Sequence, residues 1–188
     1  MSYSSKPFAG ALFAFLTLVA SDVAATPLPP TLQAELIVRV AGYDKGLRAR
    51  AGDAVRVLIV VKVNDDDPWA EKLRAGFLQT DKIGGLAHIE TVARYATATE
   101  LAKTVRRQQI AIVVLPASLG DDVEAVRSSL DGVNVLTVVP DGDLVRRGVV
   151  LGFELVSGKP HLFFNTSQAS RQHVVMSADV MKLMKVFE

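Results

Sequence analysis

The sequence predicts a single α/β domain: a mostly parallel sheet flanked by helices on both faces, with a C-terminal antiparallel hairpin and a closing helix. Runs of β-branched and other apolar residues alternate with amphipathic segments between residues 32 and 140, which is typical of a doubly wound parallel sheet. Beyond residue 148, two apolar runs are joined by the turn sequence SGKP, which predicts the hairpin. A chain of 188 residues fits one domain of ordinary size.

The first 25 residues are expected to be a signal peptide that is not part of the fold. A polar start with Lys6 precedes an apolar stretch over residues 8–20. That stretch is shorter than the about 20 residues that span a bilayer, and small residues follow it. We therefore predict export to the periplasm, with no membrane insertion after cleavage; an uncleaved anchor is the alternative. Residues 26–31 form an extended proline-containing tether, and residues 32–188 form the domain.

Different hydrophobic spacings predict the first elements of the domain. Residues 32–47 carry apolar side chains at helical spacing, in one stripe. Residues 55–63 are nearly all β-branched or apolar, which suits a strand that is covered on both faces. Residues 68–80 are helical again, and the sequence DKIGG ends that helix.

A second strand, a capped helix and a third strand follow. Residues 87–95 read as a strand. Thr97 is followed three residues later by Glu100, a capping-box pattern that predicts the start of a helix. Residues 110–116 are wholly apolar, and we expect this strand to lie beside strand 55–63 in the centre of the sheet.

The remaining elements complete the α/β pattern and then depart from it. Residues 120–132 form a helix whose early carboxylates suit its N-terminal dipole. Residues 133–139 form a fourth strand, and the sequence DGDLVRRG forms a short helix or turn. Strands 149–156 and 161–165 pair antiparallel, and a final helix is expected over residues 177–187.

The acidic run Asp65, Asp66 and Asp67 raises the question of a metal site. Asp67 precedes Pro68, a residue favoured at the first helical position, so Asp67 suits an N-cap and the other two carboxylates gain from the helix dipole. A magnesium-binding pocket of the receiver type would also need a phosphoacceptor after strand 110–116, where the sequence reads VVLPASLG. The acidic run is therefore interpreted as the start of a helix, and a metal site is the weaker alternative.

No catalytic residue, metal ligand or cofactor site is predicted. The chain has no cysteine, which excludes thiolate chemistry and disulfides. Its three histidines are far apart, and it has no G-x-S-x-G, P-loop or G-x-G-x-x-G motif. The net charge of +1, without a basic block, gives no support to nucleic-acid binding. These observations favour a binding protein over an enzyme.

The C-terminal third, RRGVVLGFELVSGKPHLFFNTSQASRQHVVMSADVMKLMKV, resembles the closing block of the YfiR-type periplasmic repressors. The matching positions are small, aromatic or capping residues: Gly148, Phe153, Gly158, Asn165, Ala169 and Ser177. NDDDPWAEKL also resembles a strand-then-DPF helix entry of that family, with Trp69 in place of phenylalanine. The resemblance covers residues 35–186.

This resemblance implies an exported, non-enzymatic regulator. Such proteins bind the periplasmic domain of an inner-membrane diguanylate cyclase, or by extension a sensor kinase, and repress it, so that cyclic-di-GMP and biofilm formation respond to envelope conditions. Some members are dimers, so a homodimer is also implied. The sequence departs from the family at the first helix, which keeps only Tyr43 of an aromatic motif similar to F-x-K-F-V-x-W-P, and it lacks the cysteines of some members.

Two surfaces are candidates for partner binding. One is the first helix around Tyr43, and the other, which we favour, is the final helix with Met181, Met184 and Phe187. Core packing is the alternative role for the C-terminal methionines. The alternative function is a periplasmic small-molecule (solute) binding module, because α/β sheets bind ligands at the carboxyl ends of their strands. Exposed apolar patches would favour the regulator, and a closed polar cleft would favour solute binding.

Overall fold

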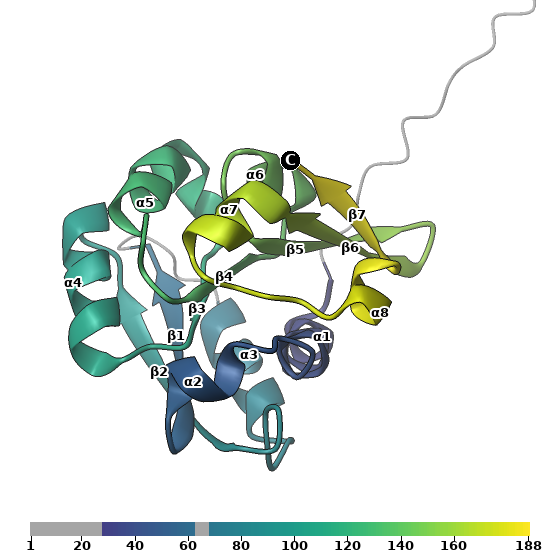
Figure 1. Cartoon of the computed structure of the whole chain (residues 1–188), viewed down its shortest axis with the longest axis horizontal. Helices are drawn as coiled ribbons and strands as arrows, with labels where there is room; N and C mark the ends of the chain where they lie inside the picture. Colours follow the sequence, from purple (N-terminus) through teal and green to yellow (C-terminus); the bar gives the residue numbers. More distant parts are fainter. Residues whose placement is uncertain (1–27, 63–67) are drawn as a thin grey trace, which may run out of the picture.

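A seven-stranded sheet forms the centre of the computed structural model, which describes residues 28–62 and 68–188 (Figure 1). The strand order is β2-β1-β3-β4-β5-β6-β7. The strands are β1 (Ala54–Val61), β2 (Ala87–Arg94), β3 (Ile112–Val114), β4 (Leu136–Val139), β5 (Leu151–Val156), β6 (Lys159–Asn165) and β7 (Met184–Phe187). All neighbouring strands are parallel except β5 and β6, which form the predicted antiparallel hairpin. The predicted α/β class is confirmed.

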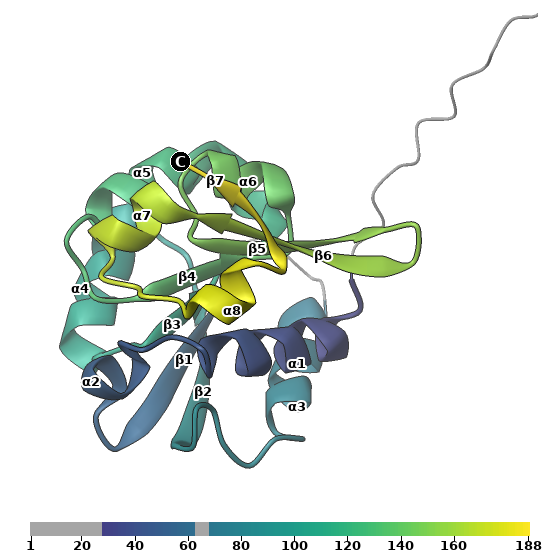
Figure 2. The same cartoon turned by 45° about the vertical axis from the view of Figure 1, so that its right-hand side comes forward.

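Helices pack on both faces of this sheet, over two separate clusters of buried apolar side chains. The first face is covered by α1 (Pro30–Ala41), α2 (Leu47–Ala51), α3 (Trp69–Phe77) and α8 (Ala178–Met181). The second face is covered by α4 (Ala98–Gln108), the 3-10 helix η1 (Ala117–Asp122), α5 (Val123–Ser129) and α6 (Gly142–Arg146). Helix α7 (Thr166–Arg171) follows β6. The tip of the β5–β6 hairpin projects beyond the body of the molecule (Figure 2).

Strand β1 explains why the central strands read as continuous apolar runs. Its side chains alternate between the two faces, with Val57 and Ile59 in the first cluster and Leu58 and Val60 in the second. All four are buried. Strands β1 and β3 are parallel neighbours inside the sheet, as predicted, and Val57 lies opposite Ile112 in their register.

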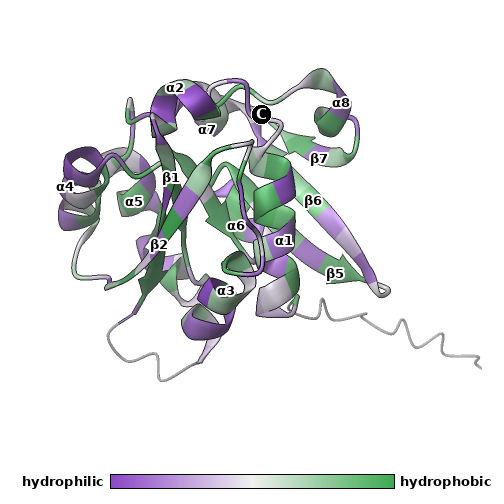
Figure 3. Cartoon of the chain, turned by 90° about the horizontal axis from the view of Figure 1, so that it is seen from below, coloured by the Kyte–Doolittle hydropathy of each residue, from purple (hydrophilic) through white to green (hydrophobic). Residues whose placement is uncertain are grey.

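Helix α4 is the element whose start the sequence predicts most directly. The Thr97 side-chain oxygen accepts a hydrogen bond from the N–H of Glu100 at 3.2 Å, so the predicted N-cap is confirmed. The helix ends at Gln109, which adopts a left-handed conformation with φ 51° and turns the chain into β3. The outer turns of α4 are hydrophilic, whereas apolar residues gather on the central strands (Figure 3).

Two predicted helices have different extents in the structure. The first ends at Ala41, and a turn through Gly42–Gly46 separates it from α2. The closing helix is present as α8, but it covers only Ala178–Met181, and the prediction of helix over the following residues is wrong: Met184–Phe187 form β7 beside β6. Pairing with β6 satisfies the backbone of these four residues, and this tertiary contact overrides their helical spacing.

Some predictions fall outside the described residues. They are the signal peptide, residues 26–27 of the tether, and the roles of Asp65, Asp66 and Asp67. The rest of the predicted tether is described, and its last two residues, Pro30 and Thr31, are not extended but form the start of helix α1, where proline is favoured. Helix α3 itself begins at Trp69, close to the predicted helix start. Within residues 28–62 and 68–188, no helix combines the length and apolar composition that a membrane span requires.

Candidate functional site

Two segments that are far apart in the sequence meet beside helix α8. Asp44, between α1 and α2, forms an isolated antiparallel bridge with Met176, and two backbone hydrogen bonds of 2.9 and 3.0 Å flank it. Side chains alternate across such a bridge, so Asp44 and Met176 point to the interior while their neighbours point outward. Accordingly, Asp44 and Met176 are buried, whereas Tyr43 is 51% exposed and Val175 is 53% exposed.

A buried ion pair holds this bridge on the sheet. Arg50 of α2 contacts the Asp44 carboxylate through Nη2, and the other Asp44 oxygen accepts the N–H of Val175 at 3.1 Å. Arg50 also donates through Nε to the carbonyl of Ala111 and through Nη1 to Asn134 Oδ1, both at 3.1 Å. Both buried charges are therefore paired and hydrogen-bonded, which offsets the cost of their desolvation. Tyr43 and Val175 are consequently displayed on a rigid support.

Strand β7 adds a second exposed apolar segment. It lies at the end of the sheet, so one of its two edges has no neighbouring strand among the described residues. Leu183, just before the strand, is 74% exposed, and Val186 is 41% exposed. An edge strand that carries exposed apolar residues is suited to pairing with another chain. We call Tyr43, Val175, Leu183 and Val186 the apolar surface.

Phe187 lies on the opposite face of β7 and is partly enclosed by its own molecule. Its ring stacks on that of Phe163, with centroids 6.0 Å apart and planes inclined by 5°. The guanidinium carbon of Arg146 lies 4.8 Å from the Phe187 centroid, and the ammonium nitrogen of Lys185 lies 5.8 Å from it. The ring stacking holds the end of β7 against β6, and the cation–π contact of Arg146 holds it against α6.

The four residues predicted to bind a partner thus differ in accessibility. Tyr43 is exposed, Met181 and Phe187 are half-buried, and Met184 is buried in the first-face cluster. Core packing, the alternative role for the methionines, is found for Met176 and Met184. Whether any of the four residues contacts a partner stays a prediction.

Three residues of the apolar surface were not predicted from the sequence as partner-binding residues: Val175, Leu183 and Val186. A helix over residues 177–187, which the sequence predicts, would arrange the side chains with a period of 3.6 residues. The period of two along β7 instead places Met184 and Val186 on one face and Phe187 on the other. The signal that could have found the strand is its Met-Lys-Val-Phe composition, because a β-branched residue and an aromatic residue favour strands.

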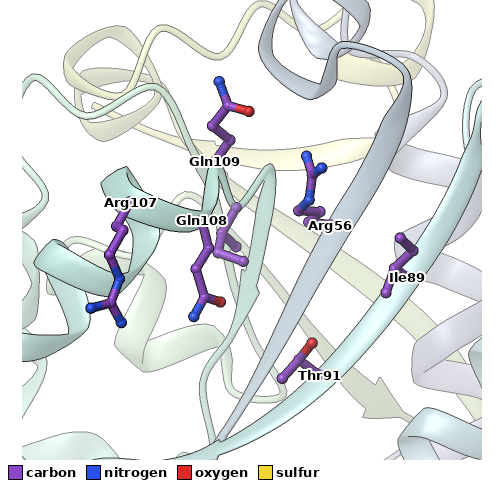
Figure 4. A pocket seen from close by; sticks show the side chains of 7 residues that line it. Arg56, Ile89, Thr91, Arg107, Gln108 and Gln109 are labelled. Atoms are coloured by element: carbon purple, nitrogen blue, oxygen red, sulfur yellow. The ribbon is translucent and has the colours of Figure 1, made fainter.

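Two open grooves flank the last turn of helix α4. The first has a volume of about 390 Å³ and is lined by Arg56, Ile89, Thr91, Arg107, Gln108 and Gln109, together with Ile110 (Figure 4). The second has a volume of about 380 Å³, shares Gln109 and Ile110, and extends to Arg50 and Asn134. Both lie near the amino-terminal ends of β1 and β3 and not at the carboxyl ends, where α/β sheets usually bind ligands.

Among the described residues at the carboxyl ends of the strands, one titratable group, Tyr95, has a clearly shifted pKa. Tyr95 follows β2 and is buried. Burial, and secondarily the negative charge of Asp122, raise the pKa of Tyr95 above its ordinary value of 10.0. Asp122 itself pairs with Lys62 at 3.3 Å. Across the part of the chain that the structure describes, no cluster of three or more histidine or acidic residues could hold a metal ion.

The sequence of the described domain matches a known protein family. Residues 31–185 match the model of DUF4154, described as YfiR/HmsC-like. That range covers nearly all of the described domain, including both grooves and three residues of the apolar surface, Tyr43, Val175 and Leu183; Val186 lies just beyond it. No curated protein matches the sequence.

Solved structures share the fold at low sequence identity. A conserved domain protein from Vibrio cholerae has a TM-score of 0.54 at 12% identity, over 85% of this chain and 60% of that one. An ABC domain in complex with L-Trp from Streptococcus pneumoniae has a TM-score of 0.58 at 14% identity, over 84% and 60%. A substrate binding protein from Clostridium difficile, in a ligand-free open structure, has a TM-score of 0.51 at 10% identity, over 77% and 58%. The chain spans about three fifths of the length of these proteins.

Proposed function

The chain belongs to the YfiR/HmsC-like family, and on that premise we propose that it is an exported, non-enzymatic regulator that docks on a membrane signalling protein. The partner is the periplasmic sensor domain of an inner-membrane diguanylate cyclase or sensor kinase, which the docked regulator holds inactive. Envelope conditions then control cyclic-di-GMP and biofilm formation. The observation that supports docking is the apolar surface, which the described part of the monomer leaves open to solvent.

The apolar surface has features of a recognition site. Tyr43 and Val175 are displayed by a bridge that a buried ion pair holds in place, so little side-chain or loop ordering is needed on binding. Leu183 and Val186 lie beside the free edge of β7, whose backbone N–H and C=O groups can pair with a partner strand. Exposed aromatic and aliphatic anchors are the side chains on which binding energy usually concentrates.

Cyclic-di-GMP levels test this proposal. Deleting the gene should raise cyclic-di-GMP, and the wild type should restore it. A double variant, Tyr43→Ser with Leu183→Ser, should fold but fail to restore it, because exposed substitutions cost little stability. Leu78→Ser is the matched control, since Leu78 is 65% exposed beyond the end of α3 and outside the apolar surface. An unchanged level after deletion, or full repression by the double variant, contradicts the proposal.

A homodimer through β7 would use part of the same surface. Edge-to-edge pairing of two β7 strands would cover Leu183 and Val186 in both copies. Sedimentation equilibrium of the wild type and of Leu183→Ser distinguishes the arrangements. If the wild type is a dimer and Leu183→Ser is a monomer, the β7 edge serves self-association, and the partner binds elsewhere.

The second candidate function is a periplasmic small-molecule binding module. The two grooves beside α4 favour this function. The ABC domain in complex with L-Trp has a similar fold, and the similarity extends to the fold alone. Native mass spectrometry of the purified protein provides the test. A small molecule that co-purifies in equimolar amount, together with cyclic-di-GMP that does not respond to deletion, would replace the regulator with this function.

A further inference from the structure

None of the described helices covers one end of the second sheet face. Deep in the sheet, this face carries the buried residues Leu58 and Val60 beneath the helices. Toward the amino-terminal ends of β1 and β2 it carries Arg56, Ile89 and Thr91, and Ile89 is 54% exposed. Helix α4 ends too early to cover these three residues, and its last turn forms the opposite wall of the groove (Figure 4).

Arginine and glutamine side chains, which donate hydrogen bonds, lie at both ends of this groove, and the arginines also carry positive charge. In Figure 4, Arg56 and Gln109 extend toward one end, while Gln108 and Arg107 extend toward the other. The described residues that line the groove include no aspartate and no glutamate. Among the described residues, neither arginine makes an ion pair. Two arginines thus line one open groove, and none of the described ion pairs neutralises either of them.

A structural role explains only part of this arrangement. The aliphatic stem of an arginine often covers apolar surface while its charge stays in water, and Arg56, which is half-buried, fits that role. Covering apolar surface does not account for the second arginine, Arg107, or for the two glutamines, Gln108 and Gln109, on the facing wall. Guanidinium groups bind carboxylates and phosphates through paired hydrogen bonds, which is the chemistry that this groove offers.

We propose that the groove binds an elongated small dianion. One oxyanion end meets Arg56 and Gln109, the other meets Arg107 and Gln108, and the middle of the ligand crosses the groove between them. The volume of about 390 Å³ falls within the range of roughly 300–1,000 Å³ that is typical of small-molecule sites. This site lies at the β2 end of the sheet, so it is separate from the β7 part of the apolar surface.

Calorimetric titration of the purified domain with a dicarboxylate series tests the proposal. The probes are succinate, glutarate, adipate and pimelate, with inorganic pyrophosphate as the phosphate arm and acetate as the monoanion. We expect saturable binding with an optimum chain length, or binding of pyrophosphate, and weaker affinity at higher salt. Acetate that binds as tightly as the best dianion contradicts a two-ended site, and no saturable binding by any probe contradicts the site itself.

Two substitutions locate the binding. Arg56→Gln and Arg107→Gln should each weaken the best probe by about tenfold or more, because each removes a charge-assisted contact. Arg48→Gln is the matched control, since Arg48 is an exposed arginine of α2 outside the groove. Thermal unfolding checks that each variant is folded. Retained affinity in both groove variants, or an equal loss in the control, overturns the assignment. The titration uses no partner protein, so its outcome is independent of the proposed repression.

Discussion

At the scale of single residues, Asp44 and Arg50 are the charges whose burial has the largest consequence. Their side chains are almost fully buried and pair directly. Asp44→Ala should lower the free energy of unfolding by about 3–5 kcal/mol, because Arg50 is left buried without its anion. Urea denaturation measures the change. Asp179→Ala is the control, since it breaks an exposed pair with Lys182, and it should unfold like the wild type. A small effect of Asp44→Ala would show that Arg50 gains water.

Tyr95 gives the molecule a predictable response to alkaline pH. Because the folded pKa lies above 10.0, both states keep the proton below that value, and the residue adds no pH dependence there. Above pH 10, the unfolded chain loses its proton first, so stability falls as the pH rises. Tyr95→Phe should make the unfolding free energy fall less steeply above pH 10. Tyr43→Phe is the control, because Tyr43 is exposed. If Tyr43→Phe makes the unfolding free energy fall less steeply to the same extent, the burial of Tyr95 is not the origin of the pH dependence.

Whether a residue's role can be predicted from the sequence depends on how far away in the sequence its contacts lie. Thr97 contacts Glu100, three residues away, and the sequence predicts that cap directly. Arg50 contacts Asn134 and Ala111, which are 84 and 61 positions away, so no local pattern could reveal its partners. The same holds for Tyr43, whose exposed side chain is defined by a bridge to the segment around Val175. Local chemistry is therefore predictable here, and the candidate surface is predictable only in part.

At the scale of elements, the N-cap of α4 offers a quantitative test. The helix has a single strong cap, in which Thr97 accepts the N–H of Glu100 at 3.2 Å. Thr97→Ala should cost about 1 kcal/mol of unfolding free energy, because that N–H loses its partner. Thr97→Ser keeps the hydroxyl and should retain most of the stability. Chemical denaturation distinguishes the two variants, and equal losses would mean that the methyl group of Thr97, and not its oxygen, stabilises the helix.

The elements of the central sheet were more predictable than those at its end. Strands such as Ala54–Val61 are buried on both faces, so their composition alone identifies them. Strand β7 has only four residues and owes its conformation to β6, a long-range contact that spacing within residues 177–187 does not contain. Helix α7 (Thr166–Arg171) was not predicted, because its N-cap, Asn165, is also the last residue of β6 and no turn sequence separates the two elements. A helical spacing of apolar residues therefore predicts secondary structure poorly in short elements whose conformation depends on tertiary contacts.

At the scale of the whole molecule, the dianion groove and the apolar surface are joined by a chain of contacts. Ile110 lines the groove, and the next residue, Ala111, accepts a hydrogen bond from Arg50. Arg50 pairs with Asp44, whose other oxygen holds the N–H of Val175 in the bridge beneath the apolar surface. Spatial continuity alone does not establish coupling, which requires that a ligand at one site change a measurable property of the other.

Amide hydrogen exchange measures that coupling without a partner protein. If occupancy of the groove stiffens the contact chain, the best dianion should slow exchange at Ala111 and also at Lys45 and Val175, whose N–H groups are hydrogen-bonded within the bridge. Arg50→Lys keeps a positive charge near Asp44 but cannot make all the guanidinium contacts, so protection should persist at Ala111 and disappear at the bridge. Protection confined to Ala111 in the wild type would mean that the dianion site and the apolar surface act independently, because a ligand with no differential effect on the bridge cannot alter docking there.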